Sequence, residues 1–444
     1  MPNTRKATCY LFPTFDCPVR RAEDRTRAKG AARSILLDGQ SRLPLHLKNT
    51  APYLLLLSAE SPHSASPGGI VLARLLSDYP AEKLLVVTNH LPTSEATKLD
   101  CRYEFLPLVA DRLNSTRFAG WRPILRAFGA SGFVSTARVD AALAGFVPQV
   151  VATLMQDSWF YDLAANFALF RKLPLVLLVH DLAHGFESVP SWVHKRQIER
   201  DKRIVRQAST RLCISAPMAE FFAHEFGAQA EVLHPPRAER PVSQAPERAA
   251  NLRQPGRLTL GYAGGLHYGY GEQLLRMVPV LRATGTRVEV FGPLPGGSVA
   301  GLSAVTDVFR FHGLAPTPEE AWRGLLERCD AVLQPYLNPP GPHELQYRTH
   351  FPSKLGEALS IGLPLLVTGP DYASGSAWCA ARPGSALLVT EAGTAPLRAA
   401  LERLRDDAGM RVRLAGCAQQ TALELSAPML RHRFQEHVLH AARV

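Results

Sequence analysis

A hydroxyl, an ammonium and a carboxylate stand close together in the segment FPSKLGEALSIGLPLLVTGP, residues 351–370. The pattern predicts a short helix that opens at Ser353 and Lys354, carries Glu357 one turn later and ends at Gly362. A helix N-terminus attracts anions, and Lys354 adds a full positive charge. This trio therefore suits a ligand with a diphosphate and neighbouring hydroxyls, such as a nucleotide sugar, with Lys354 on phosphate and Glu357 on ribose. The alternative is a capping serine beside a solvated Lys–Glu pair.

The elements that position this segment are predicted by two series of short apolar runs, which alternate with helical patterns. The first series extends from PYLLLLSA at 52 to EVLHPP at 231, and the second from LTLGYAGG at 258 to SALLVT at 385. Such alternation predicts right-handed βαβ units and parallel sheets, so the fold class is α/β with two domains in tandem. The boundaries we expect are a basic N-terminal extension at 1–50, a domain at 51–240, a linker at 241–257, a domain at 258–424 and a final helix at 425–444.

Composition narrows the class of protein. The 444 residues carry a net charge of +11, which favours an anionic partner such as a nucleotide, a nucleic acid or an anionic membrane, or reflects only a basic surface. Because basic residues are spread out and no reader motif occurs, nucleic acid is not expected. The seven cysteines form no C-x-x-C pair, which argues against a zinc site or a disulfide framework. No apolar run approaches the length of a membrane span, so we expect a cytoplasmic protein.

Three further features stand at predicted strand ends. Gly68 and Gly69 precede the helix pattern IVLARLL, and Gly264 and Gly265 end the strand pattern LTLGYAGG. Glycines let the backbone approach a ligand closely, although both pairs could simply form turns. His180 ends the strand LPLVLLV and can donate a hydrogen bond near neutral pH, or it is only structural.

A basic helix predicted near 192–212 offers a separate surface. It could rest on anionic lipid, or be a solvated face with its apolar stripe in the core. The aromatic residues that follow the strand QVVATLM could form an acceptor wall or belong to the core. These two sets are Lys195, Arg196, Arg200, Lys202, Arg203, Arg206 and Arg211, and Trp159, Phe160 and Tyr161.

The order of these segments resembles that of the retaining GT-B glycosyltransferases of family 4. FPSKLGEALSIGLPLLVTGP resembles their donor-site helix, GYAGGLHYGYGEQLL their glycine turn, and DVFRFHGLAPTPEEAWRGLLERCDAVLQPY the middle of their donor domain. In the first half, LVLLVHDLAHGF, TRLCISAPMAEFF and EVLHPP occupy the places of three further family segments. The resemblance covers about residues 52–425.

The resemblance implies two Rossmann-like domains facing a central cleft, an acceptor domain at 51–240 and a nucleotide-sugar domain at 258–424, with the last helix crossing back to the first domain. It implies transfer of a sugar from a nucleotide diphosphate with retention, without a metal, and with no cofactor beyond the nucleotide sugar as co-substrate. Carried over by position, the catalytic residues are His180 and Glu357, the acceptor or phosphate loop holds Gly68 and Gly69, and the donor-binding residues are Gly264, Gly265, Arg348, Ser353, Lys354 and Glu357.

Three positions depart from the family pattern. Thr349 stands where the family has the first of two glutamates, and either Glu344 or His350 could serve the donor sugar in its place. Gly265 and Tyr270 stand where the family has an arginine and a lysine that hold the diphosphate. Lys354 and Arg348 would then carry the phosphate charge.

The expected activity is that of a hexosyltransferase in bacterial cell-surface polysaccharide or glycolipid synthesis. Its partners would be a nucleotide-sugar donor, a saccharide or lipid-linked acceptor and, by peripheral contact, the inner face of an anionic membrane. Two alternatives stay open, a non-catalytic GT-B-like protein that binds nucleotides or sugars, and a nucleotide-sugar epimerase.

Overall fold

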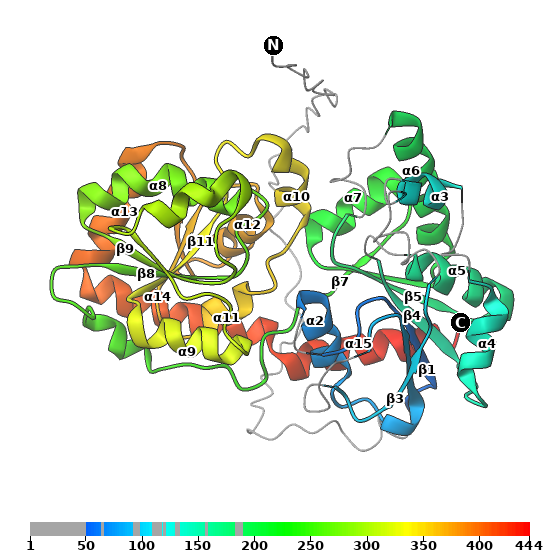
Figure 1. Cartoon of the computed structure of the whole chain (residues 1–444). Coiled ribbons are helices and arrows are strands. Elements are labelled where there is room, and N and C mark those ends of the chain that lie inside the picture. Colours follow the sequence, from blue (N-terminus) through cyan, green and yellow to red (C-terminus); the bar gives the residue numbers. More distant parts are fainter. Residues whose placement is uncertain are drawn as a thin grey trace, which may run out of the picture. The chain divides into compact units, whose positions relative to one another are not determined.

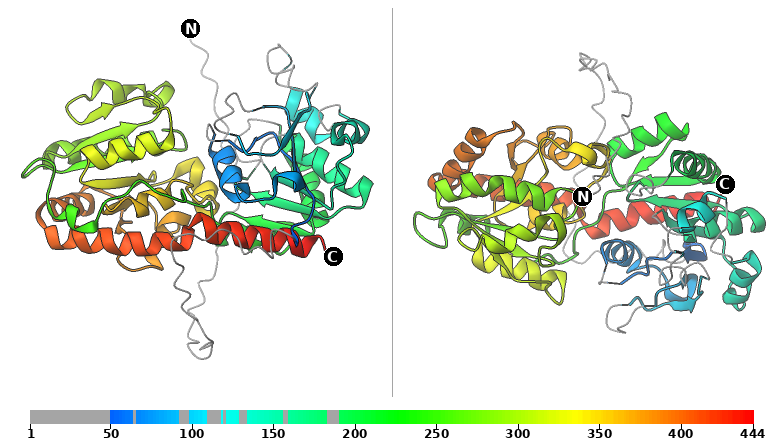
Figure 2. Two further views of the ribbon diagram at one scale, coloured as in Figure 1. Left: turned by 90° about the horizontal axis from the view of Figure 1, so that it is seen from below. Right: turned by 45° about the horizontal axis from the view of Figure 1, so that its top comes forward.

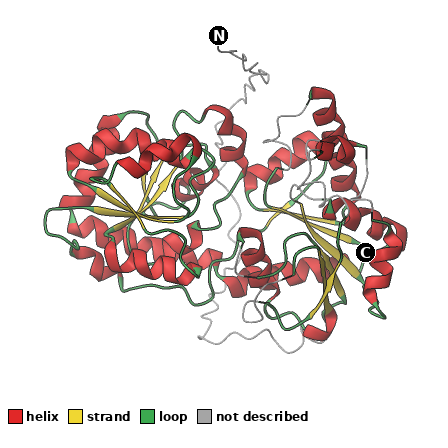
Figure 3. Ribbon diagram, viewed as in Figure 1, coloured by secondary structure: helices red, strands yellow, loops and turns green. Residues whose placement is uncertain are grey.

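The computed structural model describes residues 50–63, 66–91, 98–108, 118, 121–128, 134–155, 159–182 and 190–444. The basic extension predicted for residues 1–50 lies outside these ranges except for Thr50. Two parallel sheets, each with helices on both faces, organise the described residues (Figures 1 and 3). We call the part that holds the first sheet the N-lobe and the part that holds the second sheet the C-lobe.

The N-lobe sheet has seven strands in the order β3-β2-β1-β4-β5-β6-β7, and every neighbouring pair is parallel. The strands are β1 (Leu54–Leu57), β2 (Leu84–Thr88), β3 (Arg102–Phe105), β4 (Val150–Met155), β5 (Leu175–Val179), β6 (Thr210–Cys213) and β7 (Glu231–Val232). The helices are α2 (Pro67–Leu76), α3 (Arg122–Ala127), α4 (Thr136–Leu143), α5 (Phe160–Arg171), α6 (Ser191–Gln207) and α7 (Ala216–Phe226).

Alternation along the strands divides the N-lobe core into two layers. In β1 the side chains of Leu55 and Leu57 join the layer that includes α5, whereas Leu54 and Leu56 join the layer that includes α2. All four leucines are buried, because a parallel sheet is covered on both faces. The continuous apolar runs that predicted these strands follow from this double burial.

The C-lobe sheet has six parallel strands in the order β10-β9-β8-β11-β12-β13. The strands are β8 (Thr259–Ala263), β9 (Arg287–Phe291), β10 (Phe309–Phe311), β11 (Ala331–Pro335), β12 (Leu365–Thr368) and β13 (Leu387–Val389). The helices are α8 (Tyr270–Thr284), α9 (Pro318–Arg328), α10 (Glu344–Thr349), α11 (Leu355–Ser360), α12 (Ser374–Ala380), α13 (Thr394–Asp406) and α14 (Ala408–Thr421). Thr317 caps α9 by accepting the N–H of Glu320 at 3.2 Å, as its position before an acidic first turn predicts.

The last helix, α15 (Ala427–Ala441), belongs to the N-lobe core although it follows the C-lobe in sequence. It runs from the C-lobe to the N-lobe (Figure 2), where it packs on α2 and on the strands β5 and β6. Its residues Leu430, Phe434 and Val438 are buried in the same layer as Leu54. Arg431 adds an ion pair to Asp78 and another to Glu239 at 3.1 Å. The segment predicted as a linker contains a short 3₁₀ helix, Pro246–Ala250, which packs on α14.

The helix that the sequence predicted to begin at Ser353 starts later in the structure. The helix α11 begins at Leu355, two residues later than expected, because the N–H of Leu355 turns back to the carbonyl of Pro352 at 2.9 Å. Its first helical bond joins the N–H of Ala358 to the carbonyl of Lys354 at 3.0 Å. With six residues α11 is too short for its dipole to hold an anion by itself, so any phosphate affinity here must come from side chains.

Candidate functional site

The strand ends of both sheets carry the candidate residues into one cluster. His180 and Asp181 follow β5 of the N-lobe, and the turn from Gly264 to His267 follows β8 of the C-lobe. His350 and Lys354 flank the turn between α10 and α11. Electrostatic interactions connect His267 to Lys354, His350 and Asp181, so residues of both lobes share one site.

A carboxylate–imidazole pair joins the lobes at this cluster. The Nδ1 atom of His350 lies 3.0 Å from Oδ1 of Asp181. Burial acts to raise the pKa of Asp181, but the close contact with His350 and the other nearby imidazoles outweigh it, so its pKa is lowered. Asp181 is therefore a carboxylate at neutral pH, and it holds the ring of His350 in place.

His180 is a neutral imidazole in this site. It is buried, and burial lowers its pKa to about 4 although Asp181 opposes this shift. A neutral ring can donate one hydrogen bond and accept another without adding charge. This state suits the recognition of a hydroxyl more than the binding of a phosphate.

Lys354 lies against the glycine turn. Its Nζ atom is 4.0 Å from the ring centre of Tyr262 and 4.9 Å from that of Tyr270, and a Cβ atom on Gly264 would lie 3.1 Å from it. Burial lowers the pKa of Lys354 to about 7. The aromatic faces supply attraction without a counter-charge, which leaves this cation available to an anionic ligand.

The glycine turn is shaped by close contacts. Gly264 has φ +128°, a conformation that side chains avoid, and a Cβ atom on Gly265 would collide with the imidazole of His267. Buried Tyr262 donates its hydroxyl hydrogen to the carbonyl of Gly265, and Tyr347 donates to the carbonyl of Tyr268 at 2.6 Å. Tyrosine hydroxyls therefore fix the backbone that faces Lys354.

Glu357 is engaged within the protein. One oxygen, Oε1, lies 2.5 Å from Nη1 of Arg74 and accepts the N–H of Ala238 at 3.0 Å. Arg74 comes from α2, the helix that begins with the turn of Gly68 and Gly69, so this ion pair is a second link between the lobes. The other oxygen, Oε2, is buried and makes no hydrogen bond to the described residues. Only this second oxygen could receive a ribose hydroxyl.

The two remaining predicted donor-binding residues, Arg348 and Ser353, do not lie at the glycine turn in the way that Lys354 does. Arg348 is exposed, pairs with Glu344 at 2.8 Å and stacks on Tyr372 with 3.9 Å between Cζ and the ring centre. Ser353 lies in the turn before α11 and does not cap it. Lys354 is therefore the cation at the glycine turn, whereas Arg348 is paired with Glu344 on the surface.

Thr349 has no free hydroxyl to offer in the place of the family glutamate. Its hydroxyl donates to the carbonyl of Leu345 at 2.8 Å, and its own carbonyl accepts the Ser215 hydroxyl at 2.5 Å. Ser215 also caps α7 through the N–H of Met218. Of the two substitutes that the sequence leaves open, Glu344 is held by Arg348 on the surface and His350 lies in the cluster.

In the N-lobe, Gly69 permits a tight loop ahead of α2. A Cβ atom on Gly69 would lie 2.7 Å from the carbonyl oxygen of Ser61 and 2.8 Å from Oγ of Ser66. Ser66 caps α2 by accepting the N–H of Gly69 at 3.1 Å and donates to Glu60. Gly68 and Gly69 are both buried in the first turn of α2, so they pack this loop closely.

The aromatic residues after β4 belong to the core. Trp159, Phe160 and Tyr161 are at most 2% exposed, which excludes the acceptor wall that their position suggested. The hydroxyl of Tyr161 donates to Asp201 of α6 at 2.9 Å, while Asp162 pairs with Arg200 at 2.6 Å. This network fixes α5 against the basic helix.

Sequence reasoning missed the partners that join the lobes. Asp181, Arg74 and Ser215 were not assigned to the site from the sequence. The H-D pair at a strand end was the available signal for Asp181. No local pattern marks Arg74, since its partner Glu357 lies far along the chain.

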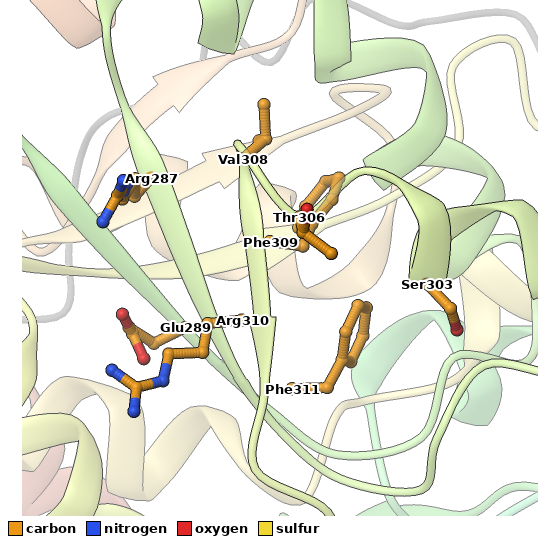
Figure 4. A pocket seen from close by; sticks show the side chains of 8 residues that line it. All are labelled: Arg287, Glu289, Ser303, Thr306, Val308, Phe309, Arg310 and Phe311. Carbon is orange, nitrogen blue, oxygen red and sulfur yellow. The ribbon is translucent and has the colours of Figure 1, made fainter.

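A separate pocket of about 290 Å³ surrounds the edge strand β10, lined by Arg287, Glu289, Ser303, Thr306, Val308, Phe309, Arg310 and Phe311 (Figure 4). Arg310 lies beside Glu289 in the strand register, and Phe311 beside Val290. None of the lining residues belongs to the cluster around Lys354, so we do not assign this pocket to the site. Among the described residues no group of three or more His, Cys, Asp or Glu could hold a metal ion.

Solved structures similar to this chain are glycosyltransferases of the GT-B fold. The Anabaena protein Alr3699/HepE, in complex with UDP and glucose, superposes with a TM-score of 0.59 at 14% identity and covers 87% of this chain and 98% of its own. Sucrose-phosphate synthase from Thermosynechococcus elongatus gives 0.61 at 14% identity, with 87% and 98% covered. An α,α-trehalose-phosphate synthase from Burkholderia vietnamiensis gives 0.54 at 13% identity, with 88% and 98% covered.

No protein-family model and no curated protein matches the sequence. At these identities the structures establish the fold, and the chain has the two-lobed GT-B fold with parallel sheets that the sequence predicted.

Proposed function

We propose that this chain transfers a sugar from a nucleoside-diphosphate donor to an acceptor hydroxyl with retention at the anomeric carbon. The observation that carries the proposal is the position of Lys354, a cation held by aromatic faces at the glycine turn, in one cluster with His180 and the Asp181–His350 pair. The C-lobe would bind the nucleotide and the N-lobe the acceptor. The similar Anabaena protein was solved in complex with UDP-glucose, which supports a nucleotide sugar as the donor class.

In this proposal each residue acts on a different part of the donor. Lys354 neutralises the charge of the departing diphosphate, which in turn takes the proton of the attacking hydroxyl. Neutral His180 hydrogen-bonds a hydroxyl of the donor sugar. His350, oriented by Asp181, takes over the sugar contact that the family assigns to the glutamate at the position of Thr349.

For the acceptor, the transferred sugar and the cellular compartment, we propose what the sequence led us to expect. The acceptor is a saccharide or a lipid-linked glycan of the bacterial cell surface, the transferred sugar is a hexose, and the reaction needs neither a metal nor another cofactor. We place it in the cytoplasm, a setting with which the five free thiols among the described residues are compatible. No helix in the described part of the chain is long and apolar enough to span a membrane.

One observation favours a second function, a protein that binds nucleotide sugars without transferring them. Oε1 of Glu357 is occupied by Arg74 and by the N–H of Ala238, and Gly265 and Tyr270 replace two cations of the family pattern. Such a protein would bind the donor and release no nucleotide.

A two-step experiment separates the functions. A thermal-shift screen with a panel of nucleoside diphosphates identifies the base, because a ligand that binds only the folded state raises Tm. The matching nucleotide sugars are then incubated with the purified chain and acceptor mixtures, and nucleotide release and sugar products are followed by NMR and mass spectrometry.

We expect nucleotide release to fall roughly 10²–10³-fold in Lys354→Ala and His350→Ala, while Arg398→Ala, an exposed cation of α13, retains wild-type activity. Binding without release would establish the non-catalytic function, and conversion of the donor sugar without an acceptor would indicate an epimerase. A chain that binds no nucleoside diphosphate would refute the proposal.

A further inference from the structure

The basic helix α6 presents only part of its charge to solvent. Arg200 is buried against Asp162, and Arg206 donates to the carbonyl of Phe226 at 2.9 Å. The helix ends at Gln207, earlier than predicted, so Arg211 lies in β6, where it donates to carbonyls that include that of Val205. Lys195, Arg196 and Arg203 remain exposed along one side of the helix. The sequence-predicted basic face is therefore smaller than the charge count suggested.

Large aromatic side chains flank these exposed cations. Trp121 is 56% exposed, Phe128 is 59% exposed and Trp192 is 50% exposed. The rings of Phe128 and Trp192 lie 6.2 Å apart, and the guanidinium of Arg196 lies 4.5 Å from the ring centre of Phe128. Phe128, Trp192 and Arg196 therefore form one cluster where α3 packs on α6, and Trp121 stands at the other end of α3. We call these side chains, together with two further exposed cations of α6, the aromatic–basic patch: Trp121, Phe128, Trp192, Lys195, Arg196 and Arg203.

The patch lies near the candidate site. His180 and Asp181 follow the carboxyl end of β5, and α6 is the next helix of that βα unit, so its first turn lies toward the same edge of the sheet. Trp192 stands in that first turn. A surface that binds the patch would therefore be presented to the edge at which the acceptor must enter.

We propose that the aromatic–basic patch docks this protein on an anionic lipid surface, and that the acceptor is lipid-linked and reaches the site from that surface. The part of the inference that concerns the acceptor rests on the proposed transferase function. The part that concerns the contact with lipid does not. Tryptophan and phenylalanine rings enter the headgroup region of a bilayer, and lysine and arginine beside them pair with anionic headgroups.

Charge complementarity favours lipid over the other occupants of such a surface. The patch carries three exposed cations, Lys195, Arg196 and Arg203, and the exposed carboxylate beside them on α6 is that of Glu199. A second copy of the same patch would bring these cations together, which like-charge repulsion opposes. Single-stranded nucleic acid would need cations that track a strand, whereas these residues flank one aromatic cluster.

The contact can be measured on the full chain with vesicles of defined composition. Vesicles of phosphatidylcholine alone are compared with vesicles of equal parts phosphatidylcholine and phosphatidylglycerol, by flotation and by tryptophan fluorescence. Trp159, Trp322 and Trp378 are buried, so a blue shift on vesicle addition reports the two exposed tryptophans of the patch. We expect binding to the anionic vesicles to be roughly hundredfold stronger, and weaker at about 1 M salt.

Two variants and one matched control test the patch. Trp192→Ser/Phe128→Ser should lose most vesicle binding at either salt concentration, and Lys195→Glu/Arg203→Glu should lose the preference for anionic vesicles. Arg398→Glu/Arg413→Glu changes the net charge equally through exposed residues of α13 and α14 and should bind like wild type. The nucleoside-diphosphate thermal shift is recorded for every variant, since an unchanged shift shows that the fold and the donor site are intact.

Vesicle binding equal in wild type and both patch variants would overturn the proposal, as would the absence of any preference for anionic vesicles. A dimer seen by light scattering and lost in Trp192→Ser/Phe128→Ser would identify a second copy as the occupant and would also overturn it. If the protein does not bind vesicles but a nucleoside diphosphate still raises its Tm, the lipid-docking proposal is refuted and the proposed transferase function is not. Vesicle binding without a nucleotide shift supports the patch and refutes the transferase.

Discussion

Lys354 holds a positive charge at the glycine turn only while it is protonated. Burial lowers its pKa to about 7, so above neutral pH the unliganded protein holds an increasing share of neutral amine. A diphosphate beside the amine favours the charged form and raises the pKa again. Ligand binding is therefore coupled to proton uptake in the window between pH 7 and the ordinary pKa of lysine, 10.5.

We predict that nucleoside-diphosphate affinity falls by up to about tenfold per pH unit above neutrality in the wild type. Isothermal titration at about pH 8, in two buffers with different ionisation enthalpies, should give different heats because a proton is taken up. Lys354→Met should bind weakly at every pH and show equal heats in both buffers. Equal heats in the wild type would show that Lys354 does not contact the phosphates.

His180 makes the folded state sensitive to acid. Its pKa is lowered from 6.5 to about 4 by burial, so the unfolded chain binds a proton that the folded chain rejects between these values. Stability then falls as pH drops through this window, by up to about 3 kcal/mol. We predict that His180→Gln loses less stability than wild type between about pH 7 and 4.5 in urea unfolding, since glutamine does not titrate. Parallel losses in both proteins would contradict this account.

At the scale of elements, the ion pair between α2 and α11 couples the two lobes. Glu357 is nearly buried and Arg74 is half-buried, so removal of the arginine leaves a carboxylate with few partners. We predict that Arg74→Met destabilises the protein by about 3 kcal/mol in urea unfolding. The double variant Arg74→Met/Glu357→Gln should recover most of this loss, because glutamine carries no charge and can still accept the N–H of Ala238.

The control for this prediction is Arg282→Met. Its ion pair with Asp307 is equally short at 2.6 Å, but both side chains are more than half exposed. We expect almost no change in the free energy of unfolding, because water screens exposed pairs. Equal effects of Arg74→Met and Arg282→Met would show that the lobes are not held by this pair.

The strands and helices differ in how well the sequence predicted them. The strands β1, β5 and β12 were predicted because double burial leaves an unbroken apolar run, and His180 followed from the end of one such run. The strand β3, with the sequence RYEF, was missed because it is partly exposed at the sheet edge. The helix α10 was not predicted, since a helix of six residues after a proline-rich turn has too few positions to show a period.

The contacts of the candidate site also include some that were predicted from the sequence and others that were not. Lys354 and Gly264 were grouped from the sequence through the resemblance to the family, and the structure brings them together. The pairing of Glu357 with Arg74 could not be predicted, because it depends on how the lobes meet rather than on any local spacing. The choice of His350 over Glu344 likewise needed the contact with Asp181 from the other lobe.

At the scale of the whole molecule, α15 makes the N-lobe depend on the end of the chain. Phe434 is 1% exposed and lies in the core layer that contains Leu54, Leu56 and Val176. Without α15 this layer would expose its apolar side chains to water, although every strand of the N-lobe sheet precedes residue 233. The N-lobe therefore cannot be complete until the final helix has been made.

We predict that Phe434→Ala lowers the free energy of unfolding by about 3–5 kcal/mol, the cost of a large buried cavity. Met429→Ala, on an exposed position of the same helix, should change it by less than about 0.5 kcal/mol. Hydrogen exchange locates the loss. Protection should fall in β1, β5 and α2, which lie in or contact this layer, and persist in β8 and β11 of the C-lobe. Uniform loss of protection in both sheets would mean that the lobes unfold as one unit, and unchanged protection in β1 would show that α15 does not complete the N-lobe core.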